Sequence, residues 1–194
     1  LAGGAGGDFD FNGRAATYDY TKANRVIIGN GNPQFYGGVN SDLTYRNFSL
    51  GLNLIYKIGG DLYDAASRDV ADDGYYWERI RSQYFVDNTW SPSNTSGTLP
   101  MVSGRDLEDV NQISSRHLYD ASFLRLKNIQ LAYKIPSSIT NRLKMGTARV
   151  YFNGANLLTV SKFKNADPEV NQYSSRGWEV PIAKTYTFGV DFSF

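Results

Sequence analysis

Cysteine is absent from the 194 residues, which excludes disulfide scaffolds, thiolate metal sites and cysteine nucleophiles. Neither sign of charge predominates: 20 basic and 19 acidic residues give a net charge of +1. The chain therefore lacks the basic footprint of a protein that binds nucleic acid. No apolar run approaches the ~18 residues of a membrane-spanning helix. Glycine-rich phosphate loops and zinc-ligand spacings are also missing, so we expect neither a nucleic-acid partner nor an enzyme.

Aromatic residues and glycine are abundant instead, with 14 Tyr, 11 Phe, 3 Trp and 19 Gly. Many of the apolar residues recur with a period of two, which is the period of a β-strand. The longest such run covers residues 48–58, and one side of it would carry Phe48, Leu50, Leu52, Leu54, Tyr56 and Ile58. The pattern predicts a strand with one apolar face.

The last residues of the chain show the same division more strongly. One side of the run 186–194 is apolar and mostly aromatic, with Tyr186, Phe188, Val190, Phe192 and Phe194. The other side would carry only small or polar residues. Alternation alone indicates one apolar face, which is equally typical of a half-buried strand in a soluble sheet.

Three further runs, 35–45, 122–135 and 148–159, complete a set of five predicted strands. The first of them is joined to 48–58 by the two-residue turn Arg46-Asn47, which predicts a β-hairpin with strands of about 11 residues, long enough to cross a bilayer at a tilt. The run 122–135 changes phase near Lys127-Asn128. A bulge or a change of environment would explain that change, and the sequence does not choose between them.

The connections between the predicted strands differ in length in a regular way. Two are short, 46–47 and 137–146, and they alternate with two long ones, 59–121 and 161–183. In an antiparallel meander, all the long loops then lie at one end, as they do in outer-membrane barrels. Five strands cannot close such a barrel, because the smallest need about eight. We therefore expect an all-β chain, an antiparallel meander that forms part of a large transmembrane β-barrel.

Four segments carry a family resemblance, and they are "RVIIGNGNPQFYGGVNSDLTYRNFSLGLNLIY", "YDASFLRLKNIQLAYKIP", "RVYFNGANLLTVSKFKNADPEV" and "PIAKTYTFGVDFSF". In this order they resemble the C-terminal end of the SusC/RagA family of TonB-dependent outer-membrane transporters of Bacteroidetes. The resemblance covers nearly all of residues 8–194. Gly31 departs from it, because it replaces the first proline of an asparagine-proline pair. Leu1 is no initiator methionine, and we expect a piece of a longer chain with the plug domain outside it.

The resemblance implies a location in the outer membrane, with membrane lipid against the apolar faces. Residues 1–34 would form an extracellular loop segment, and residues 35–194 the C-terminal strands and loops of the barrel. It further implies import of glycans or peptides, a SusD-like surface lipoprotein as partner, and TonB contact through segments absent here. Phe194 would be the signal that the outer-membrane insertion machinery reads. The alternative from the residues themselves is a soluble carbohydrate-binding β-sandwich, supported by the aromatic loop residues alone.

The early acidic segment is a candidate calcium site. Asp8, Asp10 and Asn12 have the alternate spacing of an EF-hand loop, and Asp19 stands at its twelfth position. Asp replaces the bidentate Glu of that position, and no helical flanks are evident. A solvated turn rich in Asp, Asn and Gly explains the same residues.

Aromatic residues gather in the long loop 59–121 and are candidates for ligand or partner contact. The residues singled out are Tyr75, Tyr76, Trp77 and Trp90, with Tyr84 and Phe85 nearby. Aromatic faces beside Asp, Asn and Arg suit sugar or peptide recognition, and they equally suit packing of the loop on itself or on a partner protein. The single histidine, His117, is predicted to be a surface-loop residue, and we predict no catalytic residue and no cofactor other than calcium.

Overall fold

The structure is a computed structural model that describes residues 9–11, 14–17, 19–71, 80–81, 83–103, 112–170 and 174–194. Contacts divide the chain into two compact units. The first comprises residues 1–30, 63–119 and 172–178, and the second comprises residues 31–62, 120–171 and 179–194.

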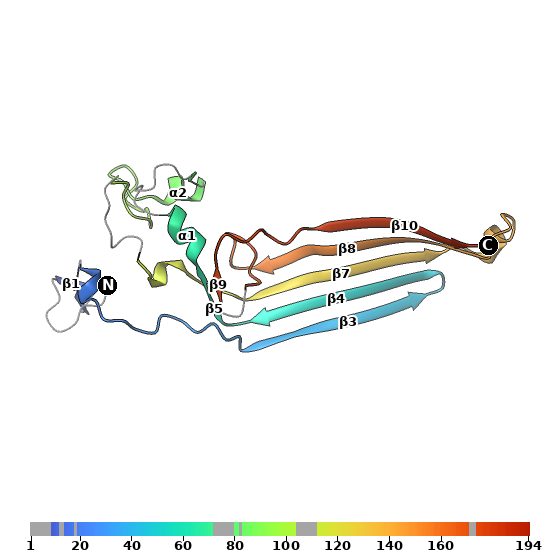
Figure 1. Ribbon diagram of the computed structural model, residues 1–194, viewed down its shortest axis with the longest axis horizontal. Coiled ribbons are helices and arrows are strands. Elements are labelled where there is room, and N and C mark those ends of the chain that lie inside the picture. The colour runs from blue at the N-terminus through green and yellow to red at the C-terminus, as the bar shows by residue number, and fades with distance from the viewer. Residues whose placement is uncertain are drawn as a thin grey trace. The chain divides into compact units, whose positions relative to one another are not determined.

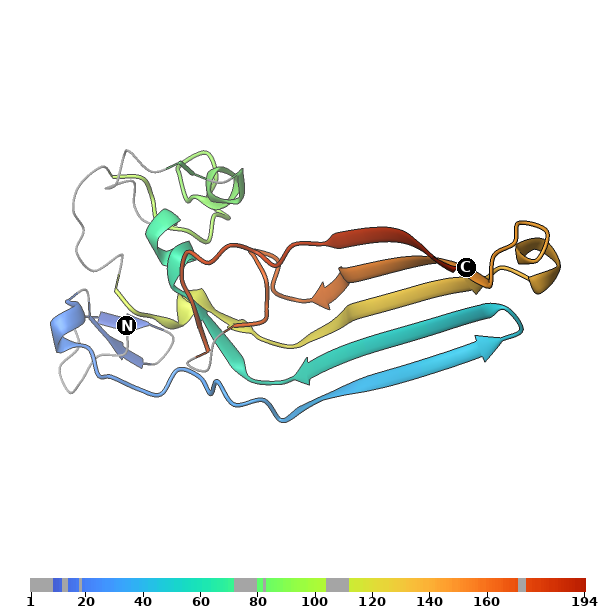
Figure 2. The ribbon, with the colours of Figure 1, turned by 45° about the vertical axis from the view of Figure 1, so that its right-hand side comes forward.

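The second unit is built on one antiparallel sheet of five strands. Its strands are β3 (Phe35–Tyr45), β4 (Phe48–Ile58), β7 (Phe123–Lys134), β8 (Thr147–Ser161) and β10 (Thr185–Ser193). Their spatial order is β10-β8-β7-β4-β3, so each strand pairs with the strand before it among these five (Figures 1 and 2). This is the predicted meander, and the bounds of β4 are those read from its alternation.

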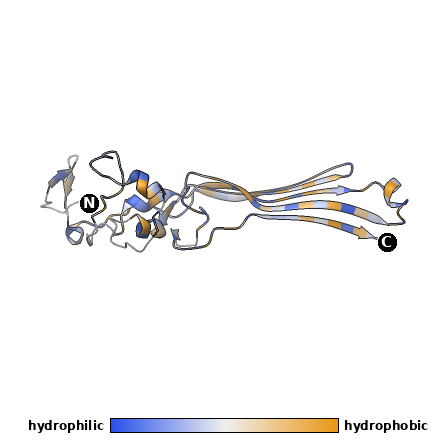
Figure 3. Ribbon diagram, turned by 90° about the horizontal axis from the view of Figure 1, so that it is seen from above, coloured by the Kyte–Doolittle hydropathy of each residue, from blue (hydrophilic) through white to orange (hydrophobic). Residues whose placement is uncertain are grey.

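The register places most of the apolar residues of the five strands on one face. Leu50 lies opposite Leu43 on one side and Leu131 on the other. Across the rest of the sheet, Leu131 pairs with Phe152, which in turn pairs with Phe188. Hydrophobic and polar residues alternate along the strands as a result (Figure 3). We call the surface that carries these residues the apolar face, and the opposite surface the polar face.

A register shift at Lys127 accounts for the change of phase in β7. On β4 the partners of Leu126 and Asn128 are the adjacent residues Leu54 and Asn53, so Lys127 is left without a partner there. The partner on β8 steps from Leu158 to Ala155 across the same point. Because the irregularity skips one residue, Leu124 and Leu126 share the apolar face with Ile129 and Leu131. The sequence left a bulge or a change of environment open, and the structure has the irregular pairing.

Short connections lie at one end of the sheet. The β3–β4 turn is Arg46-Asn47, in which Arg46 has φ 53°, and the Asn47 amide donates to the Lys134 carbonyl over 2.7 Å. Between β7 and β8 stands one helical turn, α3 (Ser137–Thr140), which begins directly after Pro136. The chain leaves the other end of the sheet after β4 and β8 and returns there to β7 and β10 (Figure 1). The predicted alternation of short and long connections is therefore confirmed.

The long connections contain regular structure that the period of two did not predict. The first unit holds the hairpin β1 (Phe9–Phe11) and β2 (Arg14–Ala16), the 3-10 turns η1 (Tyr20–Lys22) and η2 (Ser115–His117), and the six-residue helices α1 (Ala65–Val70) and α2 (Gln83–Asn88). A small sheet has the order β6-β5-β9, with β5 at Asp61–Asp64, β6 at Leu118–Asp120 and β9 at Ser175–Arg176. Ala71, Phe85 and Leu99 form a buried apolar cluster. Among the described residues, no helix is long and apolar enough to span a membrane.

Candidate functional site

The apolar face is exposed across the five-stranded sheet. Phe188 is 78% exposed, Phe48 52% and Leu43 58%, although all three lie within regular strands. The aromatic side chains contact one another across strands, with ring centroids 4.6 Å apart for Phe48 and Tyr133 and 5.0 Å apart for Phe152 and Phe188. A continuous apolar surface of this extent marks contact with a membrane or another protein.

The polar face carries hydrogen bonds and ion pairs between neighbouring strands. The Asn53 amide donates to the Asn40 side-chain oxygen across β3 and β4. Arg149 pairs with Asp191 across β8 and β10, and both side chains are about half exposed. One sheet therefore combines a surface that is apolar at nearly every position with a polar surface that suits water, which is the arrangement of a barrel wall between lipid and lumen.

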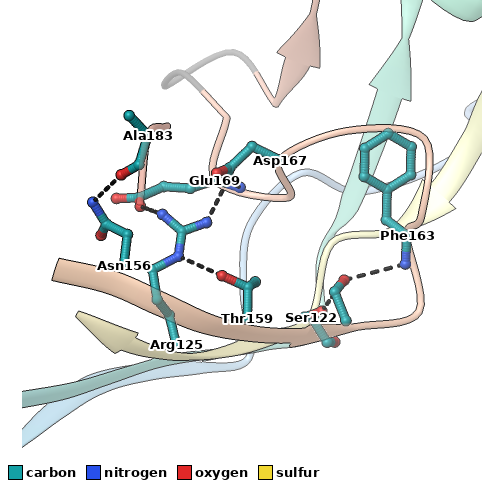
Figure 4. Close-up of polar contacts among 9 residues, drawn as sticks. Ser122, Arg125, Asn156, Thr159, Phe163, Asp167, Glu169 and Ala183 are labelled. Carbon is teal, nitrogen blue, oxygen red and sulfur yellow. Dashed lines mark hydrogen bonds and ion pairs between the residues drawn. The ribbon is translucent and has the colours of Figure 1, made fainter. Parts of the chain in front are cut away.

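Arg125 is the most deeply buried charged side chain of the second unit, with a relative exposure of 1%. It projects from β7 on the polar face, and its guanidinium binds two carboxylates of the loop after β8 (Figure 4). One nitrogen donates to Asp167, another donates to Glu169 over 2.7 Å, and Nε donates to the Thr159 hydroxyl over 3.1 Å. Asp167 also accepts from the Glu169 backbone N–H over 2.9 Å, which makes the Asp-Pro-Glu stretch an Asx-type turn. Arg125 thus fastens this loop to the sheet.

A hollow of about 280 Å³ opens beside the Arg125 cluster. The loop after β8 and the segment before β10 form its walls, and the Asn156 amide donates to the Ala183 carbonyl over 3.3 Å (Figure 4). Its lining combines the charged groups Arg125, Asp167, Lys164 and Lys184 with the apolar groups Phe163, Ala166, Pro168, Pro181 and Ile182 and the polar groups Asn156, Thr159 and Ser161. Mixed linings of this kind bind small polar ligands.

The start of β7 is fixed by a second polar cluster. Asp120 accepts from both the backbone N–H and the hydroxyl of Ser122. These hydrogen bonds are the main cause of a lowered pKa for the Asp120 carboxyl, and Lys162 lowers that pKa further. The Ser122 hydroxyl also accepts from the Gly59 N–H over 2.9 Å. The cluster therefore ties the end of β4 to the start of β7, where the chain returns from its longest connection.

The first unit contains a buried ion pair between residues far apart in sequence. Asp64 is fully buried, accepts from Arg176 over 2.7 Å and caps helix α1 by accepting from the Ser67 N–H over 3.0 Å. The pair accompanies the parallel bridge between β5 and β9. It links the first long connection to the second, which no pattern in the sequence indicated.

His117 is buried in the same unit, with an exposure of 2%, and its ring stands edge-on to Tyr63 at 6.4 Å. Burial lowers the pKa of His117 to about 4, and the nearby Arg116 lowers it in the same direction. Burial also raises the pKa of the Tyr63 hydroxyl. The imidazole is neutral at physiological pH, and its Nδ1 has no hydrogen-bond partner among the described residues. These properties describe a packed structural histidine, so the prediction of a surface residue is wrong.

Only two of the four calcium candidates lie among the described residues. Asp8 and Asn12 lie outside the described residues, whereas Asp10 is in β1 and Asp19 precedes η1. The Asp19 carboxylate accepts from the N–H and hydroxyl of Thr21 and pairs with Lys22 over 3.2 Å, and these contacts lower its pKa. Within the described ranges, no group of three or more acidic or histidine side chains could hold a metal ion. The site remains a prediction, and Asp19 has a structural partner of its own.

Of the aromatic candidates, only the later part is described. Tyr75, Tyr76 and Trp77 lie outside the described residues. Trp90 is 38% exposed, and its backbone N–H donates to the Leu99 carbonyl over 3.0 Å. Phe85 is buried beneath the Arg81 guanidinium, 5.1 Å from its ring centroid, so it packs the loop on itself. The predicted contact with a ligand or partner stays a prediction for Trp90 and its neighbours.

Comparison with known proteins bears on the whole chain. No protein-family model matches it. The TonB-dependent receptor P3 of Formosa agariphila is 31% identical over 96% of this chain, and the RagAB peptide importer in its closed-closed state has a TM-score of 0.72 with 27% identity over 97% of this chain. The chain belongs to the SusC/RagA family of TonB-dependent receptors. SusC of Bacteroides thetaiotaomicron is 26% identical over 81% of this SusC/RagA chain. The chain spans only about a fifth of each relative, 18% of receptor P3 and 20% of the RagAB chain.

Proposed function

We propose that this chain forms part of the wall of an outer-membrane transporter that imports a glycan or a peptide with energy delivered through TonB. The observation that carries the proposal is the sheet with one exposed apolar face and one polar face. A five-stranded sheet has two free edges, and the family relationship supplies the context in which further strands would pair with them. The apolar face would meet lipid, and the polar face would line the lumen.

The same proposal sets the topology. The short connections and the C-terminal end of β10 would lie on the periplasmic side, and the long connections 59–121 and 162–184 would lie outside the cell. Residues 1–34 would then be extracellular as well. Phe194, which is 91% exposed and stands edge-on to Phe192 at 5.6 Å, would end the lipid-facing row and serve as the signal for the insertion machinery.

Two partners follow from the proposal. TonB would act through segments outside this chain, and a SusD-like lipoprotein would cover the extracellular loops, where Tyr84, Val86 and Trp90 are exposed apolar side chains. The similarity to a peptide importer supports a peptide ligand, and the similarity to SusC supports a nutrient-import role. The soluble carbohydrate-binding sandwich is disfavoured, because in the described part of the chain no second sheet covers the apolar face.

Single cysteines test the topology, since this chain has none of its own. Leu52→Cys and Val190→Cys on the apolar face should react with a lipid-soluble maleimide in outer-membrane vesicles. The matched variants Asn53→Cys and Asp191→Cys, one residue further along the same strands, should react only with a water-soluble reagent. The reverse pattern would show that the faces are assigned the wrong way round.

A further inference from the structure

The hollow beside Arg125 has a surplus of positive charge. Arg125, Lys164 and Lys184 line it, whereas the nearby carboxylates are Asp167 in the lining and Glu169 next to it. Three cationic groups thus stand against two anionic ones. Both carboxylates are bound to Arg125 itself. The two lysines are exposed, and among the described residues neither has a carboxylate partner.

Arg125 retains donor capacity after holding the loop. Its guanidinium has five N–H groups, and its hydrogen bonds to Thr159, Asp167 and Glu169 use three of them. A buried arginine with unused donors, next to lysines at an open hollow, favours a ligand with acceptor oxygens and negative charge. The Thr159 hydroxyl of the lining accepts from Arg125 Nε, and its own O–H adds a further donor.

The remaining lining is apolar and partly rigid. Phe163 is only 3% exposed, and its N–H donates to the Ser161 hydroxyl over 3.1 Å, which holds this turn in place. Pro181 and Ile182 close the hollow from the segment before β10. Apolar surface beside cationic donors suits a small organic acid group better than a bare inorganic ion, because the carbon skeleton of the ligand has a surface to pack on.

We propose that this hollow is a binding site for a carboxylate of the imported molecule, held by Lys164 and Lys184 with Arg125 beneath them. The proposal rests on the proposed transport function and adds the chemical class of the ligand. A carboxylate can come from an acidic sugar or from the C-terminus of a peptide, and the hollow recognises the group that both share. At about 280 Å³ it holds one terminal residue of either molecule.

Calorimetric titration of the full-length transporter in detergent tests the charge requirement. The probes are trigalacturonate against its methyl ester, and trialanine against its C-terminal amide. A free acid whose carboxylate the hollow holds should bind about tenfold more tightly than its ester or amide, because the carboxylate contact is lost. Preference for only one free acid would identify the source of the carboxylate. Equal binding of the free acid and its ester or amide within both pairs would overturn the proposal.

Variants locate the site. Lys164→Gln combined with Lys184→Gln should abolish the preference for the free acid, whereas Lys134→Gln, at the opposite end of β7, should leave it unchanged. Both lysines are exposed, so the double variant should assemble normally, and heat-modifiable migration on gels checks this. A full preference in the double variant would place the carboxylate elsewhere. If the transporter imports neutral ligands as well as it imports acids, the proposed carboxylate site is wrong, whereas the proposed transport function stands.

Discussion

Gly189 of β10 lies directly opposite Tyr151 of β8, and the tyrosine ring occupies the space above the glycine. A Cβ atom placed on Gly189 would clash with Cζ of Tyr151. The absence of a side chain at position 189 therefore allows the aromatic ring to lie flat across the neighbouring strand on the polar face.

Gly189→Ala should destabilise the sheet edge by about 1–2 kcal/mol, because the Tyr151 ring must leave its position. Tyr151→Ala removes the obstacle, so the double variant should lose less stability than the two single variants added together. Urea unfolding of the refolded full-length barrel measures the four proteins of this cycle. Simple additivity would show that the ring and the glycine are not coupled. Thr187→Ala on the same strand face is the control.

Arg125→Gln should release the loop after β8. Asp167 and Glu169 would lose their shared cation, and we expect a local loss of about 2 kcal/mol, less than for a fully buried pair because both carboxylates are partly exposed. Trypsin should then cut after Lys162 or Lys164 roughly thirtyfold faster, since cleavage follows the open population. Arg149→Gln breaks the half-exposed pair with Asp191 and should change the rate little. Equal rates of trypsin cleavage in both variants would show that Arg125 does not hold this loop.

Acid should loosen the first unit through His117. Its pKa is about 4 in the folded protein against about 6.5 in an unfolded chain, so the folded form binds the proton less readily. The stabilising contribution of the neutral His117 is therefore fully present above pH 6.5. It falls by roughly 2–3 kcal/mol as the pH drops towards 4. Arg116 and Arg68 lower the pKa of His117 in the same direction as burial, whereas Asp64 and Asp69 raise it, and burial is the largest cause.

Hydrogen exchange of β5 and α1 at pH 7.5 and 4.5, corrected for intrinsic rates, measures this loosening. His117→Phe keeps an aromatic ring beside Tyr63 but does not titrate, so its exchange should depend less on pH. If the variant and the natural protein respond equally, the acid sensitivity belongs to other groups.

Phe194→Asp separates packing from recognition. A charge on the lipid face near an interface costs little, about 0–1 kcal/mol, so the variant refolded in detergent should unfold almost normally. If the insertion machinery reads the terminal aromatic residue, the amount of assembled barrel in cells should fall severalfold. Asp191→Asn on the polar face should change neither quantity. Equal losses in cells and in detergent would assign Phe194 a packing role.

The strands could be predicted because apolar residues recur at every second position, without a break from Phe48 to Ile58 and with one change of phase in β7. The helices α1 and α2 could not, because six residues are too few for a helical period to show. The pair Asp64–Arg176 was out of reach for a different reason: its members are 112 positions apart, and nothing local marks them. Arg125 did give a signal, a charge between Leu124 and Leu126, but only the fold brings Asp167 and Glu169 to it.

The unpaired Lys127 lets β7 carry one residue more than β4 without a change of face. If Lys127 entered the ladder instead, the first part of β7 would turn over: Leu124 and Leu126 would lie on the polar face, and Arg125 would point towards lipid. Deleting Lys127 would set Leu126 beside Asn128, as their partners Leu54 and Asn53 already are, and both halves of the strand would keep their faces. The sheet can therefore lose this residue, but it has no place for it in the ladder.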